Sequence, residues 1–295
     1  ARKVRVATLL GTIQATLTNF GYLRKRWRDN TEEERLLGVS LTGIMDCKLL
    51  NSSFPHLDYS AKIPLLEDTL RQLRNVAIST NKKWSEKLGI KQSTAITCVK
   101  PSGTVSQLVN SASGIHARHS EYYIRTVRGD NKDPMTVFLK EMGIPNEPQI
   151  NGNTESKDVS VFSFPIHSDR SSIFRNDMNA IQQLEIWKTY AEAWCEHKPS
   201  VTISVQESEW VEVGAWCWKN FDHLSGVSFL PYSDHTYKQA PYQEISKEEY
   251  GKVKKMMPKK AIDWTQLKDF EKEDNTTGSQ ELACTGGVCE LVDLT

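Results

Sequence analysis

The sequence has no excess of either charge. It carries 37 basic and 37 acidic residues, so its formal net charge at pH 7 is zero. A protein that binds nucleic acid along a broad face has an excess of Lys and Arg, so this balance argues against such a partner. The sequence also lacks an apolar run as long as a membrane span. We therefore expect a chain that contacts neither nucleic acid nor membrane.

Cysteine is scarce, and its six copies are scattered along the chain. Only Cys284 and Cys289 lie close together. A secreted disulfide scaffold has denser cysteines, so we expect reduced thiols and a cytoplasmic location. The seven histidines show no metal-binding spacing such as H-E-x-x-H, and His116-x-x-His119 alone is weak evidence. We therefore predict no metal site.

The most informative stretch of the chain runs from Ser93 to Gly114. Residues 93–99 are rich in Thr, Ile and Val, which predicts a short buried strand. The next four residues, Lys-Pro-Ser-Gly, predict a turn. Apolar residues at helical spacing then predict a helix over 104–113 that stops at Gly114. The order is strand, tight turn, helix.

A turn of this kind presents backbone N–H groups at the positive end of a helix, which suits phosphate or another anion. Gly103 has no side chain to block close approach, and neighbouring hydroxyls add donors. The alternative is that Ser102 only caps the helix and Gly103 only allows the turn. The stretch lacks the Gly-Lys-Ser/Thr ending of a P-loop. The predicted phosphate-binding residues are Pro101, Ser102, Gly103, Thr104, Val105 and Ser106.

Strands and helices alternate along the rest of the chain, which predicts an α/β fold with a largely parallel sheet. Residues 146–158 are rich in Asn, Pro and Gly and predict a surface loop. The other predicted helices are 3–28, 63–88, 134–142, 181–196 and 207–221. The other predicted strands are 35–41, 122–127, 159–164, 200–205 and 225–230.

The last fifty residues differ in composition from the rest. Residues 246–273 are rich in charge, with a short helix predicted at 247–256. Small polar residues at 274–280 predict a flexible linker before Cys284 and Cys289. A mobile dithiol can exchange disulfides with two partners in turn. Two alternatives stay open, half of a zinc site and an inert tail.

The stretch Lys-Pro-Ser-Gly-Thr-Val-Ser-Gln-Leu-Val at 100–109, with Gly-Ile-His at 114–116, resembles the substrate-phosphate loop of ribonucleotide reductases. Its Pro-Ser-Gly-Thr form is similar to that of the adenosylcobalamin-dependent class II enzymes, whereas class I enzymes more often have Pro-Ser-Glu-Thr. Residues 122–134 and 226–242 resemble the monomeric ribonucleoside-triphosphate reductases. The resemblance runs from about Val4 to the C-terminus and covers only the C-terminal portion of that family's longer chain.

The resemblance implies a fold and a partner. The fold is the C-terminal part of the ten-stranded α/β barrel of the reductases, with a flexible C-terminal tail. Residues 1–245 would form part of the catalytic barrel, 246–273 a helical, charged segment, and 274–295 a redox tail. Part of a barrel leaves open strand edges, so the N-terminal part of the reductase is an expected partner.

The resemblance also implies an activity, the thiyl-radical reduction of ribonucleoside triphosphates to deoxyribonucleotides for DNA synthesis. Its cofactor is adenosylcobalamin, with no contacts assigned in this chain. Cys284 and Cys289 would re-reduce the active-site disulfide and be reduced by thioredoxin. The family's radical cysteine lies in an Asn-x-Cys-x-Glu loop, which this sequence lacks. We therefore expect a reductase part that is inactive alone. The alternatives are a fragment of a class I large subunit, or a non-catalytic nucleotide-binding subunit with the same fold.

Overall fold

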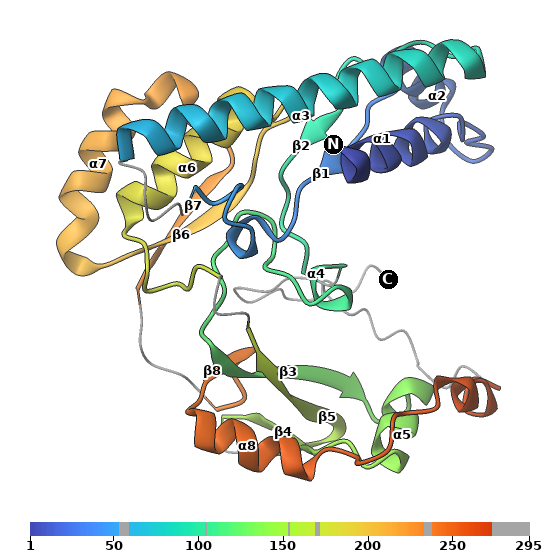
Figure 1. Ribbon diagram of the computed structural model, residues 1–295. Coiled ribbons are helices and arrows are strands. Elements are labelled where there is room, and N and C mark those ends of the chain that lie inside the picture. The colour runs from blue at the N-terminus through green and yellow to red at the C-terminus, as the bar shows by residue number, and fades with distance from the viewer. Residues whose placement is uncertain (53–58, 104, 153, 169–171, 233–237, 273–295) are drawn as a thin grey trace. The chain divides into compact units, whose positions relative to one another are not determined.

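The structure, a computed structural model, forms two compact units (Figure 1). The first consists of Ala1–Arg118 and Ser171–Tyr232, and the second of His119–Arg170 and Ser233–Thr295. The predicted division into 1–245, 246–273 and 274–295 stays a prediction. The residues that the structure describes are 1–52, 59–103, 105–152, 154–168, 172–232 and 238–272.

The strands described in the first unit lie parallel in pairs, β1 with β2 and β6 with β7. Backbone hydrogen bonds join the two pairs, because His197 N–H donates to Thr97 O and Ser200 N–H donates to Val99 O, both at 3.0 Å. Each pair is parallel, and these bonds connect the segment before β6 with β2 and the residue after it. The strands are β1 (Val39–Ser40), β2 (Thr97–Cys98), β6 (Val201–Val205) and β7 (Val227–Pro231).

The core of the first unit lies between these strands and their helices. Trp187, Tyr190 and Trp194, on or just after α6, are fully buried, and Leu70 of α3 is as well. Trp194 Nε1 donates to Cys98 O at 2.8 Å, which ties α6 to β2. The helices are α1 (Arg2–Gln14), α2 (Lys25–Glu34), α3 (Tyr59–Leu88), α4 (Val105–Leu108), α6 (Ala180–Ala193) and α7 (Trp210–Lys219). Short 3-10 helices are η1 (Ile44–Asp46), η2 (Glu207–Glu209) and η3 (Phe221–His223).

The second unit is built on an antiparallel sheet with the order β4-β5-β3-β8. Phe138 of α5 is fully buried and packs against the rings of Trp264 and Phe270. The strands are β3 (Tyr122–Asp130), β4 (Asn146–Asn151), β5 (Thr154–His167) and β8 (Tyr242–Glu244). The helices are α5 (Pro134–Glu141), α8 (Lys247–Met256) and η4 (Trp264–Asp269).

The helices with a strong apolar period form where the sequence predicts them. α3, α5, α6 and α8 match their predicted ranges within a few residues, and so do β6 and β7. The largely parallel sheet is correct only for the first unit, since the second is antiparallel. None of the helices in the described residues combines the length and apolar character that a membrane crossing requires.

Two predictions of local structure are wrong. The helix predicted at 3–28 is two helices, because α1 ends at Gln14 and the basic run 24–28 opens α2. The predicted loop at 146–158 contains β4 and the start of β5, because pairing between these strands overrides local turn propensity. Pro165 lies inside β5 and does not end it. β4 pairs with β5 no further than Phe162, so the N–H that Pro165 lacks has no β4 partner to bond.

Candidate functional site

The predicted order of strand, turn and helix is confirmed between β2 and Gly114, with a shorter helix than predicted. α4 ends at Leu108, whereas the apolar spacing predicts a helix to residue 113. After the helix, Asn110 (φ 45°) and Gly114 (φ 55°) both adopt the left-handed backbone conformation. A Cβ at Gly114 would lie 2.8 Å from the Lys100 carbonyl oxygen, so glycine is required there. Thr104 lies outside the described residues.

Ser102 is held from both sides within the first unit. Its backbone N–H donates to Ser113 Oγ at 3.0 Å, and its hydroxyl lies 2.8 Å from Thr42 Oγ1. Its carbonyl oxygen accepts a bond from the Ser106 hydroxyl. Both donors of Ser102 therefore face the protein. No described residue accepts a hydrogen bond from the backbone N–H of Gly103 or Val105.

Thr42, just after β1, connects the two ends of this loop. Its hydroxyl donates to Ala112 O at 2.9 Å and accepts from Gly114 N–H at 3.0 Å, besides contacting Ser102. Gly43 follows with φ 71°, and its N–H donates to Ala112 O at 2.8 Å. Gly43 lies close to the other end of the loop, since a Cβ there would lie 3.1 Å from that of Ser111.

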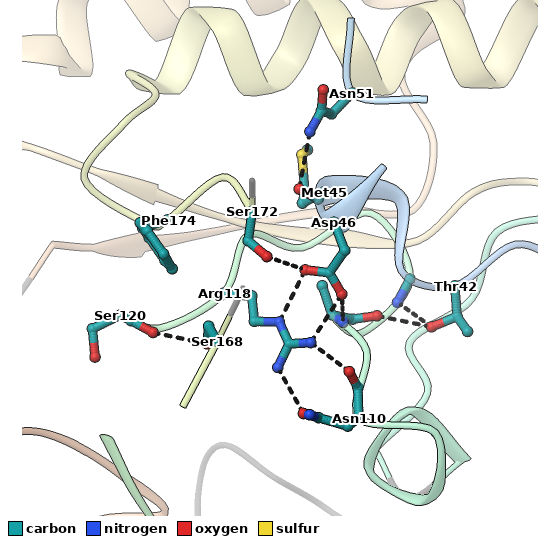
Figure 2. A network of polar contacts seen from close by, with 12 residues as sticks. Thr42, Met45, Asp46, Asn51, Asn110, Arg118, Ser120, Ser168, Ser172 and Phe174 are labelled. Carbon is teal, nitrogen blue, oxygen red and sulfur yellow. Dashed lines mark hydrogen bonds and ion pairs between the residues drawn. The ribbon is translucent and has the colours of Figure 1, made fainter. Parts of the chain in front are cut away.

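Asp46 and Arg118 form a buried ion pair beside the loop (Figure 2). Arg118 Nε donates to Asp46 Oδ1 at 2.9 Å, and Nη2 donates to Oδ2 at 3.0 Å. The Arg118 side chain is 6% exposed and that of Asp46 is 19% exposed. Ala112 N–H and the Ser172 hydroxyl also donate to the same carboxylate, at 2.7 and 2.8 Å. Such two-pronged, charge-assisted contacts fix geometry as well as charge.

Arg118 also binds Asn110, which lies just after the end of α4. Its Nη1 donates to Asn110 Oδ1 at 3.1 Å, and its Nη2 donates to Asn110 O at 2.5 Å (Figure 2). Asn110 has a left-handed backbone, so these bonds stabilise a conformation that an unsupported residue rarely adopts. The ion pair thus holds residues 110–112 in place.

The Asp46 carboxylate is ionised at neutral pH. Burial acts to raise its pKa, but the hydrogen bonds from Arg118, Ala112 N–H and Ser172 outweigh burial, and the pKa lies below the ordinary 3.8. Arg118 therefore meets a full negative charge.

His116 joins the end of the loop to β6. Its Nε2 accepts a hydrogen bond from Thr202 N–H at 3.0 Å, so Nε2 carries no proton. Its Nδ1 lies 3.1 Å from Ser113 O and is therefore the protonated nitrogen. Burial lowers the pKa of His116, while the bond to Ser113 opposes that effect. The ring is a neutral bridge between two backbone segments.

Some residues that shape the site carry no local sequence signal. Asp46, at the end of η1, and Arg118, in an isolated β-bridge, lie 72 positions apart, and neither belongs to a recognisable motif. Lys100 lies next to the predicted loop, yet its Nζ donates to Lys198 O at 2.6 Å and Ser200 Oγ at 3.0 Å. Only the fold brings these groups together.

The predicted redox pair, Cys284 and Cys289, lies outside the described residues. The described cysteines Cys47, Cys98, Cys195 and Cys217 are free thiols. Burial raises the pKa of Cys98, and it raises that of Cys195 to about 12. These two thiols therefore lack the thiolate character of reactive cysteines.

No protein-family model matches the chain. A Lactobacillus acidophilus protein named adenosylcobalamin-dependent ribonucleoside-triphosphate reductase is 26% identical over 280 residues, covering 88% of this chain and 37% of the relative. A Dictyostelium discoideum protein, named as a probable enzyme of that type, is 28% identical and covers 90% of this chain and 34% of the relative. A crystal structure of a B12-dependent, class II ribonucleotide reductase superposes with a TM-score of 0.72 at 22% identity, covering 90% of this chain and 39% of that one. The resemblance to class II ribonucleotide reductases is confirmed.

The shared fold is a partial one. The chain spans little more than a third of the length of these class II reductases. The predicted α/β fold, as part of a class II reductase, is confirmed by the superposition over 90% of the chain. The loop at 100–114 and its supports at Thr42, Asp46 and Arg118 therefore lie in a class II reductase fold.

The relatives are named for adenosylcobalamin. Two hollows of the first unit measure about 210 and 510 Å³. Drug-sized ligands fill pockets of roughly 300–1,000 Å³, and a corrin with its nucleotide tail is larger than such ligands. The smaller hollow is lined mainly by α6, the segment before it and residues near the start of α3, and the larger by residues around Thr16 and Arg28. Neither of these two hollows is large enough for the cofactor.

Proposed function

We propose that this chain is the part of an adenosylcobalamin-dependent ribonucleoside-triphosphate reductase that carries the substrate-phosphate loop. The supporting observation is the loop after β2, which is fixed at both ends while its apex stays open. Thr42 and the pair of Asp46 and Arg118 hold the ends. A Cβ at Gly103 would meet nothing within 4 Å, so the apex is accessible to a ligand. The phosphate-binding residues we propose are Pro101, Ser102, Gly103, Thr104, Val105 and Ser106.

The residues of the loop have different roles in this proposal. Ser102 positions the loop, because its N–H and hydroxyl bind Ser113 and Thr42. The backbone N–H groups of Gly103 and Val105 are the donors directed to substrate phosphate. A loop held in advance loses little conformational entropy when it binds its ligand, which favours tight binding.

The tail supplies electrons in this proposal. A thiolate of Cys284 or Cys289 attacks one sulfur of the oxidised active-site disulfide and forms a mixed disulfide. The second tail thiolate displaces the active-site sulfur and closes the Cys284–Cys289 disulfide, so two electrons reach the active site. Thioredoxin, or a similar dithiol, then reduces the tail disulfide. The described free thiols suit a reducing, cytoplasmic compartment.

The radical chemistry belongs to residues outside this chain. The sequence has no Asn-x-Cys-x-Glu loop, and the buried thiols of Cys98 and Cys195 have raised pKa values. Adenosylcobalamin, when bound to the whole reductase, supplies the radical. We therefore infer that the chain needs the rest of the reductase for turnover.

Substitution of Gly103 tests the proposal. Gly103→Val places a branched side chain where the phosphate approaches, at a position where an added Cβ meets no protein atom within 4 Å. We expect the affinity of the chain for a ribonucleoside triphosphate to fall about tenfold or more by calorimetry, a loss of about 1.4 kcal/mol. Gly21→Val is the matched control, because Gly21 also has open space around its Cβ position. Equal affinity of the Gly103 variant and the wild type would contradict the proposal.

A further inference from the structure

The carboxylate of Asp46 accepts four hydrogen bonds from three separate segments (Figure 2). Its Oδ1 accepts from Arg118 Nε at 2.9 Å and from the Ser172 hydroxyl at 2.8 Å. Its Oδ2 accepts from Arg118 Nη2 at 3.0 Å and from Ala112 N–H at 2.7 Å. A carboxylate has about four acceptor positions, so all of them are used. Arg118 alone balances the charge, so the bonds to Ala112 and Ser172 are not needed for that purpose.

The three segments have distinct places in the chain. Ala112 belongs to the loop that we propose for substrate phosphate. Arg118 is the last residue of the first unit before the chain enters the second, and Ser172 is the second residue after the chain returns. Residues 172–174 are here called the re-entry segment. Asp46 therefore binds the loop and both segments through which the chain leaves and re-enters the first unit.

The outgoing and returning parts of the chain are also bonded to each other. In the first unit, Arg118 N–H donates to Ile173 O at 3.0 Å. In the second unit, Ser168 N–H donates to Glu121 O at 2.8 Å, and the Ser168 hydroxyl donates to Ser120 O at 3.0 Å. The two parts are thus joined within each unit, so a displacement of one part reaches the other.

Residues 42–46 connect the re-entry segment to the loop. On the loop side, the first two of these residues donate hydrogen bonds to Ala112 O. On the other side, Met45 O accepts from Ile173 N–H at 2.9 Å. The Met45 residue is 2% exposed, so this connection is packed inside the first unit. Close-packed interiors have low compressibility and transmit strain, so a displacement of the re-entry segment is passed on to Ala112.

We propose that Asp46 is a positioning residue of the phosphate loop, through which the re-entry segment sets the shape of the loop and with it the affinity for a nucleoside triphosphate. This inference rests on the proposed function. One carboxylate oxygen binds Ser172 and the other binds Ala112, so the carboxylate is the shortest link between the two segments. Coupling between two equilibria is reciprocal, so bound triphosphate also stabilises the re-entry segment.

A matched pair of serine variants separates this positioning role from a role in stability alone. Ser172→Ala removes the hydroxyl that donates to Asp46, and Ser172 is 5% exposed. Ser160→Ala is the control, because Ser160 is 4% exposed and its hydroxyl donates to Asn131 Oδ1 at 2.7 Å in the second unit. Each variant loses one buried hydrogen bond, so we expect comparable losses in the free energy of unfolding in urea.

The two variants differ in their expected effect on the loop. We expect Ser172→Ala to speed hydrogen exchange of the Ala112 amide, measured by NMR, about threefold or more, and to weaken ribonucleoside triphosphate binding, measured by calorimetry, by a similar factor. Ser160→Ala leaves both quantities unchanged. An amide at position 46 keeps one acceptor oxygen, so it binds Ser172 or Ala112 but not both. Ser172→Ala therefore has no further effect on the loop in the Asp46→Asn variant.

Each outcome decides the proposal. Equal Ala112 exchange in Ser172→Ala and wild type overturns it, as does an equal change in Ser160→Ala. An undiminished effect of Ser172→Ala in the Asp46→Asn variant also overturns it, because another residue then carries the coupling. Altered exchange with unchanged triphosphate affinity overturns the role in binding. If wild type binds no triphosphate, the proposed function fails, and the exchange measurement alone decides whether Asp46 positions the loop.

Discussion

The buried ion pair of Asp46 with Arg118 fixes residues 110–112 of the loop. Arg118→Ala removes the charge partner of Asp46 and leaves the carboxylate largely buried. Removing one member of a buried pair typically costs about 3 kcal/mol or more, and the lower end applies because Asp46 keeps its bonds to Ala112 and Ser172. We expect the free energy of unfolding in urea to fall by about that amount.

Arg71→Ala is the control for this prediction. Arg71 pairs with Glu67 on the surface of α3, where the two side chains are 52% and 39% exposed. Exposed pairs contribute about 0–1 kcal/mol. The ion pair is not a principal support of the fold if the Arg118 and Arg71 variants lose the same stability.

His116 predicts a pH dependence with a definite sign. Its folded pKa is lowered from 6.5 by burial, which outweighs the opposing effect of its bond to Ser113 O, and the neutral ring accepts from Thr202 N–H. Above pH 6.5 the ring is neutral in both folded and unfolded chains, so its contribution does not change. As the pH falls below 6.5, the unfolded chain binds a proton that the folded chain does not, and stability falls until the folded pKa is reached. Asp46 acts in a separate window, because its own lowered pKa affects stability only below about pH 4.

His116→Gln tests this dependence. Glutamine can accept from Thr202 N–H and donate to Ser113 O without titrating. We expect urea denaturation between pH 5 and 7 to show a shallower loss of stability in this variant than in wild type. Identical slopes would show that His116 does not titrate as the structure indicates.

At the scale of elements, apolar periodicity predicts the position of a helix better than it predicts which face of the helix is buried. The apolar spacing of α3 and α6 predicts both the helices and their buried residues, such as Leu70 and Trp187. The same kind of spacing predicts a helix that begins as α1 does but extends too far, and within α1 Leu10 and Ile13 face outward while Thr8 and Thr12 are buried. Sequence periodicity cannot reveal this, because the inward side is set by Asn81 on another helix.

The strands and the site show the same limit. β4 forms from residues whose composition predicts a loop, because pairing with β5 decides its conformation. The strand, turn and helix around Gly103 can be predicted from the sequence because their signals are local. The roles of Thr42, Asp46 and Arg118 cannot be predicted from the sequence, since the contacts that join Thr42 to Ser102 and Asp46 to Arg118 span 60 and 72 positions.

At the scale of the whole molecule, the proposed phosphate loop lies next to a strand edge. Among the described residues β1 pairs only with β2, and the loop's supports come from the segment after β1. A neighbouring strand on β1 would therefore stabilise the segment that holds Ser102 and Ala112. The edge of β1 and the geometry of the proposed phosphate loop are thus physically linked in this fold.

The last prediction concerns electron supply to the complete enzyme. If Cys284 and Cys289 carry electrons, Cys284→Ser or Cys289→Ser abolishes multiple turnovers with thioredoxin. The first turnover survives, because its electrons are already stored in the active-site pair. A small dithiol that reaches the active site directly partly restores cycling, whereas a structural zinc role predicts bound metal and lost stability. Cys217→Ser is the control, because burial raises the pKa of that thiol. The measurement is a rapid-quench count of product per enzyme with and without thioredoxin, and the shuttle is wrong if the double serine variant cycles as wild type does.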